Sequence, residues 1–295
     1  MEGILKLQNV SKIYGNNVVV NNASFEIEKG SVCGLLGPNG AGKTTIMKMI
    51  MNQVKCDRGY ISYSDDLKVK YLSDVPEFYE FYTVNEYLNF ILDITHYVDD
   101  KEARIEEVLS LLNLKDYREL QIKKLSRGLR QKVGIASVIV DEPDILILDE
   151  PVSALDPIGR NEMFDIILKL KGKVTIIFSS HILNDVERVC DHVVLINKGK
   201  IILNDEIKNL SLDKSALLVK FKCREELLVV KESIDYECKF NSHIENCLEI
   251  YDEDILGVEK KVFSILSKKN ILVDSISIMK DSLEDIFLKE VRKNG

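Results

Sequence analysis

A glycine-rich segment, GPNGAGKTT over residues 37–45, carries the strongest chemical signal in the chain. It satisfies the spacing G-x-x-x-x-G-K-[ST], in which glycines let successive backbone amides face one centre and bind phosphate. In such a loop Lys43 reaches the β- and γ-phosphates of a nucleotide, the hydroxyl of Thr44 binds Mg²⁺, and Thr45 can bond the α-phosphate. The other cradle residues are Gly37, Asn39, Gly40, Ala41 and Gly42. The alternative is a merely flexible loop, and the apolar run VCGLL directly before it argues against that interpretation.

Two adjacent carboxylates, Asp149 and Glu150, follow another apolar run, ILIL. Four apolar residues predict a buried strand that delivers both side chains at its exposed end. Asp149 there suits Mg²⁺, and Glu150 suits the polarisation of an attacking water. An isolated pair would be interpreted as ordinary strand-end carboxylates, but the phosphate-binding loop earlier in the chain favours the catalytic interpretation. The similar string at Asp141 and Glu142 lacks such a strand, so it is interpreted as a loop.

Periodicity and turn residues predict the elements that must position these groups. The runs ILKLQNV, ASFEI and VCGLLG predict three strands, and helix formers after Gly42 predict a helix. Strand character returns at ILIL, VTIIF and VVLI with helical stretches between them, which indicates a parallel sheet buried on both faces. A capping box at Thr83 and a second helix from Asp99 make the section 76–140 helical.

The sequence predicts two unequal domains. Its 295 residues are 45% hydrophobic, enough for one large core and a smaller one. Charged alternation as in LLVKFKC and LEIYDED sets in near residue 210, with helical segments near 258–267 and near the end. We therefore expect one domain over 1–210 and a small α+β domain over 211–295, for which no chemical motif is recognised.

Composition narrows the function classes. The formal charge of −8 arises from 48 acidic and 40 basic residues without a basic stripe, which disfavours a nucleic-acid partner. No apolar run approaches the roughly 18 residues needed to cross a bilayer, and the start lacks the order of a secretory signal, so we expect a cytoplasmic chain. Six cysteines without a CxxC pair are expected to be reduced packing residues, not a metal cluster or a disulfide framework.

A third motif, LSRGLRQK over residues 125–132, connects the chain to a known family. With it, roughly residues 3–207 resemble the ATP-binding subunits of ABC transporters, whose signature reads LSGGQ, or often LS-x-G-M in exporters. The resemblance also takes in Tyr14 in KIYG, SALD at 153–156 and His181 in FSSH, all in the family's order. It implies an α/β P-loop NTPase core with a parallel sheet, an antiparallel β subdomain and a helical subdomain.

The resemblance also assigns roles. ATP and Mg²⁺ are the implied cofactors, and two subunits, identical or paired, would close head to tail so that each ATP meets one chain's phosphate loop and the other's signature. Ser126 and Gly128 would grip a γ-phosphate, His181 would act beside Glu150 and Lys43, Tyr14 would stack on adenine, and Asp156 would help join the halves. Each has a plainer alternative: a serine cap, a structural histidine, a tyrosine beside a turn glycine, and a helix cap.

Three departures from the family pattern stand out. Asp74 in YLSD occupies the position of a glutamine that touches Mg²⁺ in relatives, and because Asp is shorter and anionic its metal contact is an open question. Arg127 replaces the first signature glycine, and Val152 replaces a usual threonine. None of the three removes an essential phosphate or metal contact.

The expected function is ATP hydrolysis that powers export of a drug, antibiotic, or peptide or lipid-like substrate through separate membrane permease subunits. The chain would then lie on the inner face of the cell membrane, held by the permease. The ending SLEDIFLKEVRKNG is similar to that of drug, antibiotic and bacitracin-type exporter subunits, and the aromatic string FYEFYTVNEYL suits either a permease-docking groove or core packing. The alternatives are a soluble ABC-type mechanoenzyme and a nucleotide sensor, the latter opposed by Glu150.

Overall fold

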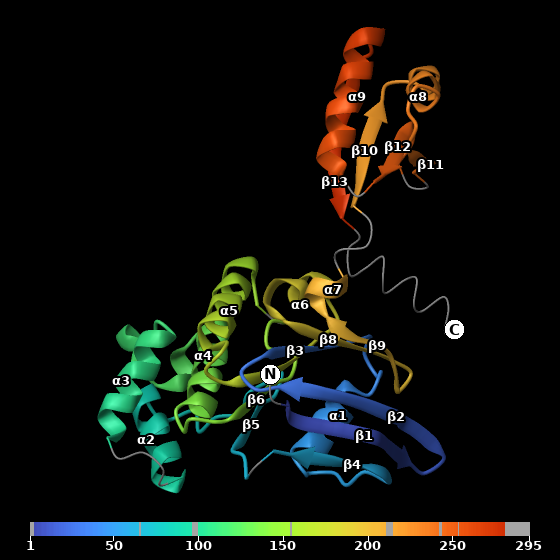
Figure 1. Ribbon diagram of the computed structural model, residues 1–295. Coiled ribbons are helices and arrows are strands. Elements are labelled where there is room, and N and C mark those ends of the chain that lie inside the picture. Colours follow the sequence, from blue (N-terminus) through green and yellow to red (C-terminus); the bar gives the residue numbers. More distant parts are fainter. Residues whose placement is uncertain are drawn as a thin grey trace. The chain divides into compact units, whose positions relative to one another are not determined.

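The computed structural model describes residues 3–64, 66–95, 100–153, 155–210, 215–241, 244–252 and 254–280, which fall into two compact units (Figure 1). The first unit runs to Ile207 and the second begins at Lys208. The sequence placed this boundary after residue 210. It lies earlier because β9 (Lys200–Glu206) is the last strand that pairs with the sheet of the first unit.

A six-stranded sheet forms the centre of the first unit, in the order β5-β6-β7-β3-β8-β9. The first five strands are parallel, and β9 runs antiparallel to β8. Every residue of β3, β6 and β7 is buried, as expected for strands covered on both faces. The predicted parallel sheet is thus confirmed. Its strands other than β9 are β3 (Val32–Leu36), β5 (Val69–Leu72), β6 (Ile145–Leu148), β7 (Thr175–Ser180) and β8 (His192–Asn197).

A smaller antiparallel sheet, in the order β2-β1-β4, packs over the first helix. One hydrophobic core joins side chains of β1 and β2, of helix α1 (Lys43–Ile50) and of the central strands β6, β7 and β8. Helix α1, which begins directly after the glycine-rich loop, is therefore held between the two sheets. The strands are β1 (Gly3–Tyr14), β2 (Asn17–Glu28) and β4 (Arg58–Tyr63).

Three helices form the expected helical section: α2 (Val84–Thr95), α3 (Lys101–Leu111) and α4 (Arg127–Ile139). The capping box at Thr83 is present, because the amide of Thr83 donates to Glu86 Oε2 at 2.8 Å and the amide of Glu86 to Thr83 Oγ1 at 3.1 Å. Helix α3 is capped by Asp100, whose side chain accepts from the amide of Ala103, whereas Asp99 lies outside the described residues. Single 3-10 turns, η1 (Lys115–Tyr117) and η2 (Ile122–Lys124), lead into α4.

Two further helices connect the central strands. Helix α5 (Pro157–Leu170) lies between β6 and β7 along the chain, and α6 (Leu183–Val189) lies between β7 and β8. Asp156 caps α5 by accepting from the amide of Gly159 at 2.7 Å. The two helices contact each other, so the segments that precede them are held together near the carboxyl ends of β6 and β7.

The second unit has the order β10, α8, β11, β12, α9, β13, with the sheet arranged β11-β12-β10-β13. This split βαβ arrangement with all neighbours antiparallel is an α+β sandwich in which helices cover one face. Its core includes Leu217, Phe221 and Leu248 from the strands and Val258 and Val262 from α9. The elements are α7 (Ile207–Leu210), which adjoins the boundary, β10 (Ser215–Phe221), α8 (Arg224–Lys231), β11 (Glu237–Phe240), β12 (Cys247–Tyr251), α9 (Ile255–Lys269) and β13 (Val273–Lys280). The further helix expected near the end lies outside the described residues.

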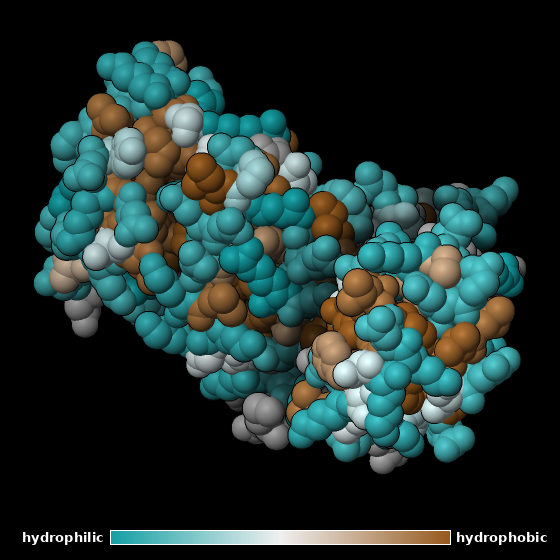
Figure 2. Space-filling model, turned by 90° about the horizontal axis from the view of Figure 1, so that it is seen from above, coloured by the Kyte–Doolittle hydropathy of each residue, from teal (hydrophilic) through white to brown (hydrophobic). Residues whose placement is uncertain are grey.

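Among the described residues, no helix is both long and apolar enough to span a membrane. The face seen in Figure 2 is largely hydrophilic, and hydrophobic side chains are exposed there in separate groups. All six cysteines are free thiols, and three of them are buried. The other three cysteines, Cys56, Cys223 and Cys238, are partly exposed.

Candidate active site

The glycine-rich loop joins β3 to the N-terminus of α1, the strand-loop-helix context that the motif requires. Gly42 caps α1 with φ of 109°, a conformation that side chains rarely adopt, and an added Cβ would lie 2.8 Å from the carbonyl oxygen of Val19. In the described part of the chain, the amides of Lys43, Thr44 and Thr45 have no acceptor. First-turn amides of this kind are a ready site for an anion.

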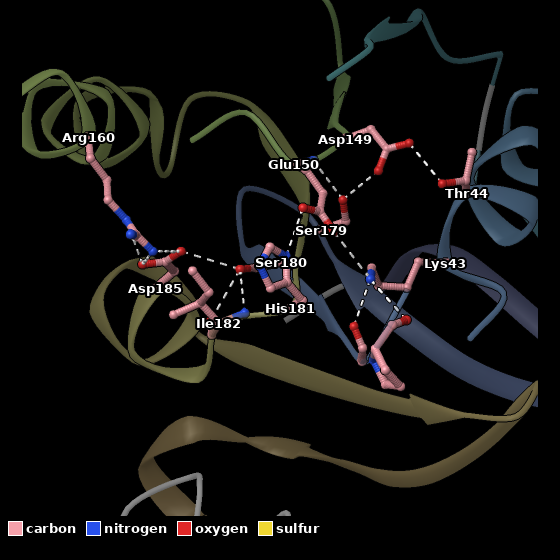
Figure 3. Close-up of polar contacts among 12 residues, drawn as sticks. Lys43, Thr44, Asp149, Glu150, Arg160, Ser179, Ser180, His181, Ile182 and Asp185 are labelled. Atoms are coloured by element: carbon pink, nitrogen blue, oxygen red, sulfur yellow. Dashed lines mark hydrogen bonds and ion pairs between the residues drawn. The ribbon is translucent and has the colours of Figure 1, made fainter. Parts of the chain in front are cut away.

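Lys43 is buried beneath this loop, and its ammonium group is held by the loop itself. Nζ donates to the carbonyl oxygen of Gly37 at 2.7 Å and lies 3.4 Å from Glu150 Oε1 (Figure 3). The side chain therefore projects one positive charge at the point where the loop meets the end of β6. That charge is well placed for a phosphate, since amides and a lysine converge on the same space.

The carboxylate of Asp149 is fixed by three hydroxyl groups from three different elements. Its Oδ2 accepts from Thr44 Oγ1 at 3.0 Å and from the phenol of Tyr71 at 3.1 Å, and its Oδ1 accepts from Ser179 Oγ at 2.6 Å. Burial, together with the charges of Asp149 and Asp74, raises the pKa of Tyr71, so the phenol stays protonated and donates. Asp149 is thus held in one orientation beside Thr44.

Glu150, the residue after Asp149, has a strained backbone conformation. Its φ is 46°, in the left-handed region that non-glycine residues seldom occupy, and its amide donates to Ser179 Oγ at 2.8 Å. Glu150 Oε2 lies 2.8 Å from Nδ1 of His181, while Oε1 faces Lys43. Strain of this kind persists where the surroundings fix it, and it is common at active sites. Three predicted catalytic residues, Lys43, Glu150 and His181, therefore meet in one place (Figure 3).

A cavity of about 610 Å³ opens between the loop and these carboxylates. Asp74 lines it together with Asp149 and Glu150, and its own Oδ1 accepts from the amide of Val75 at 2.9 Å. The phosphate-loop residues that line it are Pro38, Asn39, Gly40, Ala41, Gly42, Lys43, Thr44 and Thr45, whereas Gly37 does not line it. The volume suits a polar small molecule, and binding sites in proteins are commonly clefts of this size.

Oxygen donors in this cavity fit a magnesium ion bound together with phosphates. Thr44 Oγ1 and Asp149 Oδ2 lie side by side, and hard oxygen ligands are those that Mg²⁺ prefers. Among the described residues no group of three or more His, Cys, Asp or Glu side chains forms a metal cage. A site with one or two protein ligands is what Mg²⁺ uses when substrate phosphates supply the others.

His181 contacts Glu150 but does not itself line the cavity, and four other residues expected from the family resemblance lie apart from it. Tyr14 ends β1, is half-exposed, and has Nζ of Lys12 over its ring at 5.3 Å from the centroid. Ser126 caps α4, where its hydroxyl accepts from the amide of Leu129 at 3.3 Å, and Gly128 lies in the first turn. Asp156 is a helix cap, the plainer of its two alternatives. None of the four lines the cavity within this chain.

Two residues of the site had no role in the sequence analysis, Ser179 and Tyr71. Ser179 precedes the FSSH histidine by two positions and is fully buried. Strand β6 pairs with β7 so that Leu148 faces Phe178, which places Ser179 opposite Asp149. Tyr71 reaches Asp149 from β5 on the other side of β6. Parallel pairing of these three strands would have been the signal for both residues.

The string at Asp141 does not belong to the site. Asp141 is buried, and its carboxylate forms an ion pair with Lys70 at 2.6 Å. It follows α4 and precedes β6 along the chain, as a loop residue should. Its role is to attach α4 to β5 through a buried charge that is paired.

Comparison with known proteins gives consistent matches. A family model described as ABC transporter matches residues 20–153. The bacitracin transport ATP-binding protein BcrA of Bacillus licheniformis is 30% identical over 98% of this chain and 97% of its own length. The lantibiotic transport ATP-binding protein SrtF of Streptococcus pyogenes is 37% identical over 69% of this chain and 91% of its own length.

Solved structures support the fold. A subunit of an ABC transporter complex from Clostridium perfringens superposes with a TM-score of 0.64, is 26% identical, and covers 71% of this chain and 90% of its own. The fold that holds the glycine-rich loop and the adjacent carboxylates is thus also the fold of a known ABC transporter subunit. The chain belongs to the family of ATP-binding subunits of ABC transporters, and it is an ATPase.

Proposed function

We propose that the chain powers export of a peptide-type antibiotic or a related compound through separate membrane permease subunits. The observation that carries the ATP-dependent part is the convergence of Lys43, Asp149 and Glu150 on one cavity. Similarity to bacitracin and lantibiotic transport proteins supports the class of cargo. The peripheral position on the inner face of the membrane follows from the permease.

The site residues divide the work of hydrolysis. The loop amides and Lys43 bind the phosphates, and Tyr14 stacks on the base. Thr44 and Asp149 hold Mg²⁺, which neutralises charge on the phosphate oxygens when bound. Glu150 accepts a proton from the attacking water, and His181 orients the carboxylate of Glu150 from its other side. Asp74 adds a third carboxylate to the lining of the cavity, beside those of Asp149 and Glu150.

Ser126 and Gly128 act on the nucleotide of a second subunit. Both lie at the N-terminus of α4, where Ser126 and the neighbouring Arg127 are exposed, and neither lines the cavity of its own chain. A serine hydroxyl, free first-turn amides and the positive end of the helix dipole suit a γ-phosphate. A pair of identical or related subunits, closed head to tail, would complete each site.

A groove of about 380 Å³ beside α2 is the proposed docking place for the permease. It is lined by Tyr71, Pro76, Phe78 and Tyr87, among others, and exposed aromatic side chains lie in the same segment. Tyr79 is 61% and Phe81 74% exposed. The aromatic string thus supplies both core and surface, and its exposed part suits a helix from a membrane protein.

Affinity purification from detergent-solubilised membranes of cells that make this chain tests the proposal. We expect a polytopic membrane protein to co-purify, and expect Phe81→Asp and Tyr79→Asp to remove it. Tyr60 is 55% exposed but lies on β4 in the antiparallel sheet and does not line the groove. Tyr60→Asp should therefore leave co-purification unchanged. Recovery of ribosomes or nucleic acid with no membrane protein would instead favour a soluble mechanoenzyme.

The cargo class has its own test. Cells that lack the gene should become more sensitive to bacitracin or to lantibiotics, and the wild-type chain should restore resistance where Glu150→Gln does not. Equal sensitivity in all three strains would remove this class of cargo while leaving the ATPase intact.

For the second unit we propose a contribution to dimer contacts or to control of closure. Its core is separate from that of the first unit, and it carries none of the cavity residues. A chain that ends at residue 210 should therefore bind ATP normally but form the closed pair less readily, measured by light scattering with ATP. Unaltered pairing and turnover would dismiss this role.

A further inference from the structure

Arg160 on α5 and Asp185 on α6 form a bidentate ion pair next to the loop that carries His181 (Figure 3). Arg160 Nε lies 3.1 Å from Asp185 Oδ1, and Nη2 lies 2.5 Å from both carboxylate oxygens. Asp185 is only 4% exposed. A buried carboxylate needs a charged partner, and a guanidinium fork fixes its direction as well as its charge.

The carboxylate of Asp185 continues into the histidine loop through Ser180. Ser180 Oγ lies 3.3 Å from Asp185 Oδ2 and 3.2 Å from the carbonyl oxygen of Ile182, so its one proton is shared between these two acceptors, and it accepts from the amide of Ile182 at 2.9 Å. Ser180 and Ile182 are the two neighbours of His181 in the chain. Both sides of His181 are thereby fixed, and its ring lies 2.8 Å from Glu150.

On its other side the ion pair is attached to the segment that follows Glu150. The amide of Arg160 donates to the carbonyl oxygen of Asp156 at 2.9 Å, in the first turn of α5. The amide of Ser153 donates to the carbonyl oxygen of Glu150 at 3.1 Å. Together with the bonds of Ser180, these contacts link the first turn of α5 to the loop that carries His181, and through His181 to Glu150.

We propose that Arg160 and Asp185 are positioning residues that hold His181 against Glu150 and make its position depend on the start of α5. This inference rests on the proposed roles of Glu150 and His181. Neither Arg160 nor Asp185 lines the nucleotide cavity, so their effect reaches the site only through the loop.

The same two helices offer a matched control. Arg188 on α6 lies 2.5 Å from Asn161 Oδ1 on α5, and its guanidinium lies over the ring of Phe164, 4.8 Å from the centroid. This second contact between α5 and α6 has no bond to Ser180 or Ile182 in the described part of the chain. Arg188→Lys therefore disturbs helix packing without touching the histidine loop.

Histidine NMR of the nucleotide-free protein reads the position of His181 directly. The chain has four histidines, and the Cε1 signal that disappears in His181→Gln identifies the one of interest. Arg160→Lys, which keeps the charge but loses the fork, should shift or broaden that signal, as should Asp185→Asn. The other three signals should stay in place, and Arg188→Lys should leave all four unchanged. An unmoved His181 signal in Arg160→Lys overturns the proposal.

Steady-state hydrolysis gives the second readout. We expect Arg160→Lys to lower kcat on the order of tenfold to a hundredfold with KM for ATP unchanged, because misplacing a catalytic group costs about this much. Arg188→Lys should stay within about twofold of wild type. A purely structural role predicts the opposite: equal losses in both variants that follow their thermal unfolding midpoints.

A double variant without charge at either position tests the proposal if the single variants fold poorly. Arg160→Gln combined with Asp185→Asn leaves no unpaired buried charge, so the fold should hold. The fork is absent, so kcat should still fall and the His181 signal should still move. Wild-type kcat in this folded double variant overturns the inference. If instead Glu150→Gln hydrolyses ATP normally, the proposed role of Glu150 as base fails, whereas the NMR result still decides whether Arg160 positions His181.

Discussion

The ammonium group of Lys43 lies 3.4 Å from the carboxylate of Glu150, so the phosphate-binding loop and the strand that ends in the proposed base are joined by charge. Lys43 comes from the start of α1 and Glu150 from the end of β6, segments far apart in the sequence. A phosphate that contacts Lys43 competes with Glu150 for the same ammonium group. Binding of the nucleotide and release of the base are therefore coupled in one contact.

Glu150→Gln should retain ATP binding and reduce turnover by roughly 10²–10⁴, the range expected when a general base is lost. The amide fills the same volume but cannot take a proton from water, while the loop amides and Lys43 stay in place. Phosphate release at saturating Mg-ATP measures turnover, and titration of a fluorescent nucleotide measures binding.

Glu142→Gln is the matched control for that substitution. Glu142 also stands between an aspartate and a proline and also has positive φ, of 50°, but its side chain is 62% exposed and lies outside the cavity. Its turnover should equal that of wild type. If Glu150→Gln hydrolyses ATP as fast as Glu142→Gln does, Glu150 is not the base.

Ser179→Ala should weaken the apparent affinity for Mg²⁺ in the presence of ATP and lower kcat. The hydroxyl donates to Asp149 and accepts from the amide of Glu150, so its loss loosens a metal ligand and a strained backbone together. Loss of a hydrogen bond to a charged group costs about 1.5–3 kcal/mol, which is roughly tenfold or more in affinity. Turnover measured against Mg²⁺ concentration checks this.

Ser31→Ala controls for loss of a hydroxyl elsewhere, since Ser31 Oγ donates to the carbonyl oxygen of Glu28 in a turn. That variant should keep the wild-type dependence on Mg²⁺. The role given to Ser179 would be wrong if both variants titrate with Mg²⁺ alike.

The phosphate loop and the two carboxylates could be predicted because their signals are local. A glycine pattern or an apolar run followed by Asp149 and Glu150 is complete within a few residues. Ser179 and the pair of Arg160 and Asp185 were missed because they depend on which strands and helices are neighbours. Only the register that sets Leu148 opposite Phe178 brings Ser179 to Asp149.

Edge strands were missed for a different reason. Strand β4 is mostly exposed, with one partly buried residue, so RGYISY shows no apolar alternation to identify it. Its pairing with β1 comes from the tertiary fold and not from its own sequence. The second unit was predicted as α+β from charged alternation and two helical segments, whereas the order of its four strands depends on pairings that the sequence does not reveal.

Alkaline pH should destabilise the first unit through Cys33. Burial on β3 raises the pKa of this fully buried thiol from 9.0 to about 12. The unfolded chain releases the proton near pH 9 while the folded chain keeps it, so this contribution is complete below pH 9 and is lost as the pH rises towards 12. The slope contributed by one such thiol approaches about 1.4 kcal/mol per pH unit.

Urea unfolding between pH 8 and pH 11 measures that slope. Cys33→Ala should flatten it relative to wild type, even though the smaller side chain lowers the absolute free energy of unfolding at every pH. Burial also raises the pKa of Cys190, so part of the slope should remain. Cys56→Ala, at a partly exposed thiol, should keep the full slope. If the free energy of unfolding falls with pH equally steeply in Cys33→Ala and in wild type, Cys33 is not the source of the slope.

Asp74→Gln should strengthen binding of ATP when no metal is present. The carboxylate of Asp74 lines the same cavity as Asp149 and Glu150, and it places a third negative charge where a triphosphate binds. Asp74 is exposed, so solvent screens it, and removal of a charge that acts at about 4 Å through water is worth about 1 kcal/mol, or roughly fivefold in affinity. Titration of a fluorescent ATP analogue in EDTA at low salt measures the change.

Asp74→Glu is the control, because it keeps the charge and should bind ATP as wild type does without metal. It therefore separates the effect of the charge from that of the side-chain shape. With Mg²⁺ present the gain should shrink or reverse, because the same carboxylate then faces a cation. If Asp74→Gln binds metal-free ATP no better than Asp74→Glu, the charge of Asp74 does not make nucleotide binding depend on the metal.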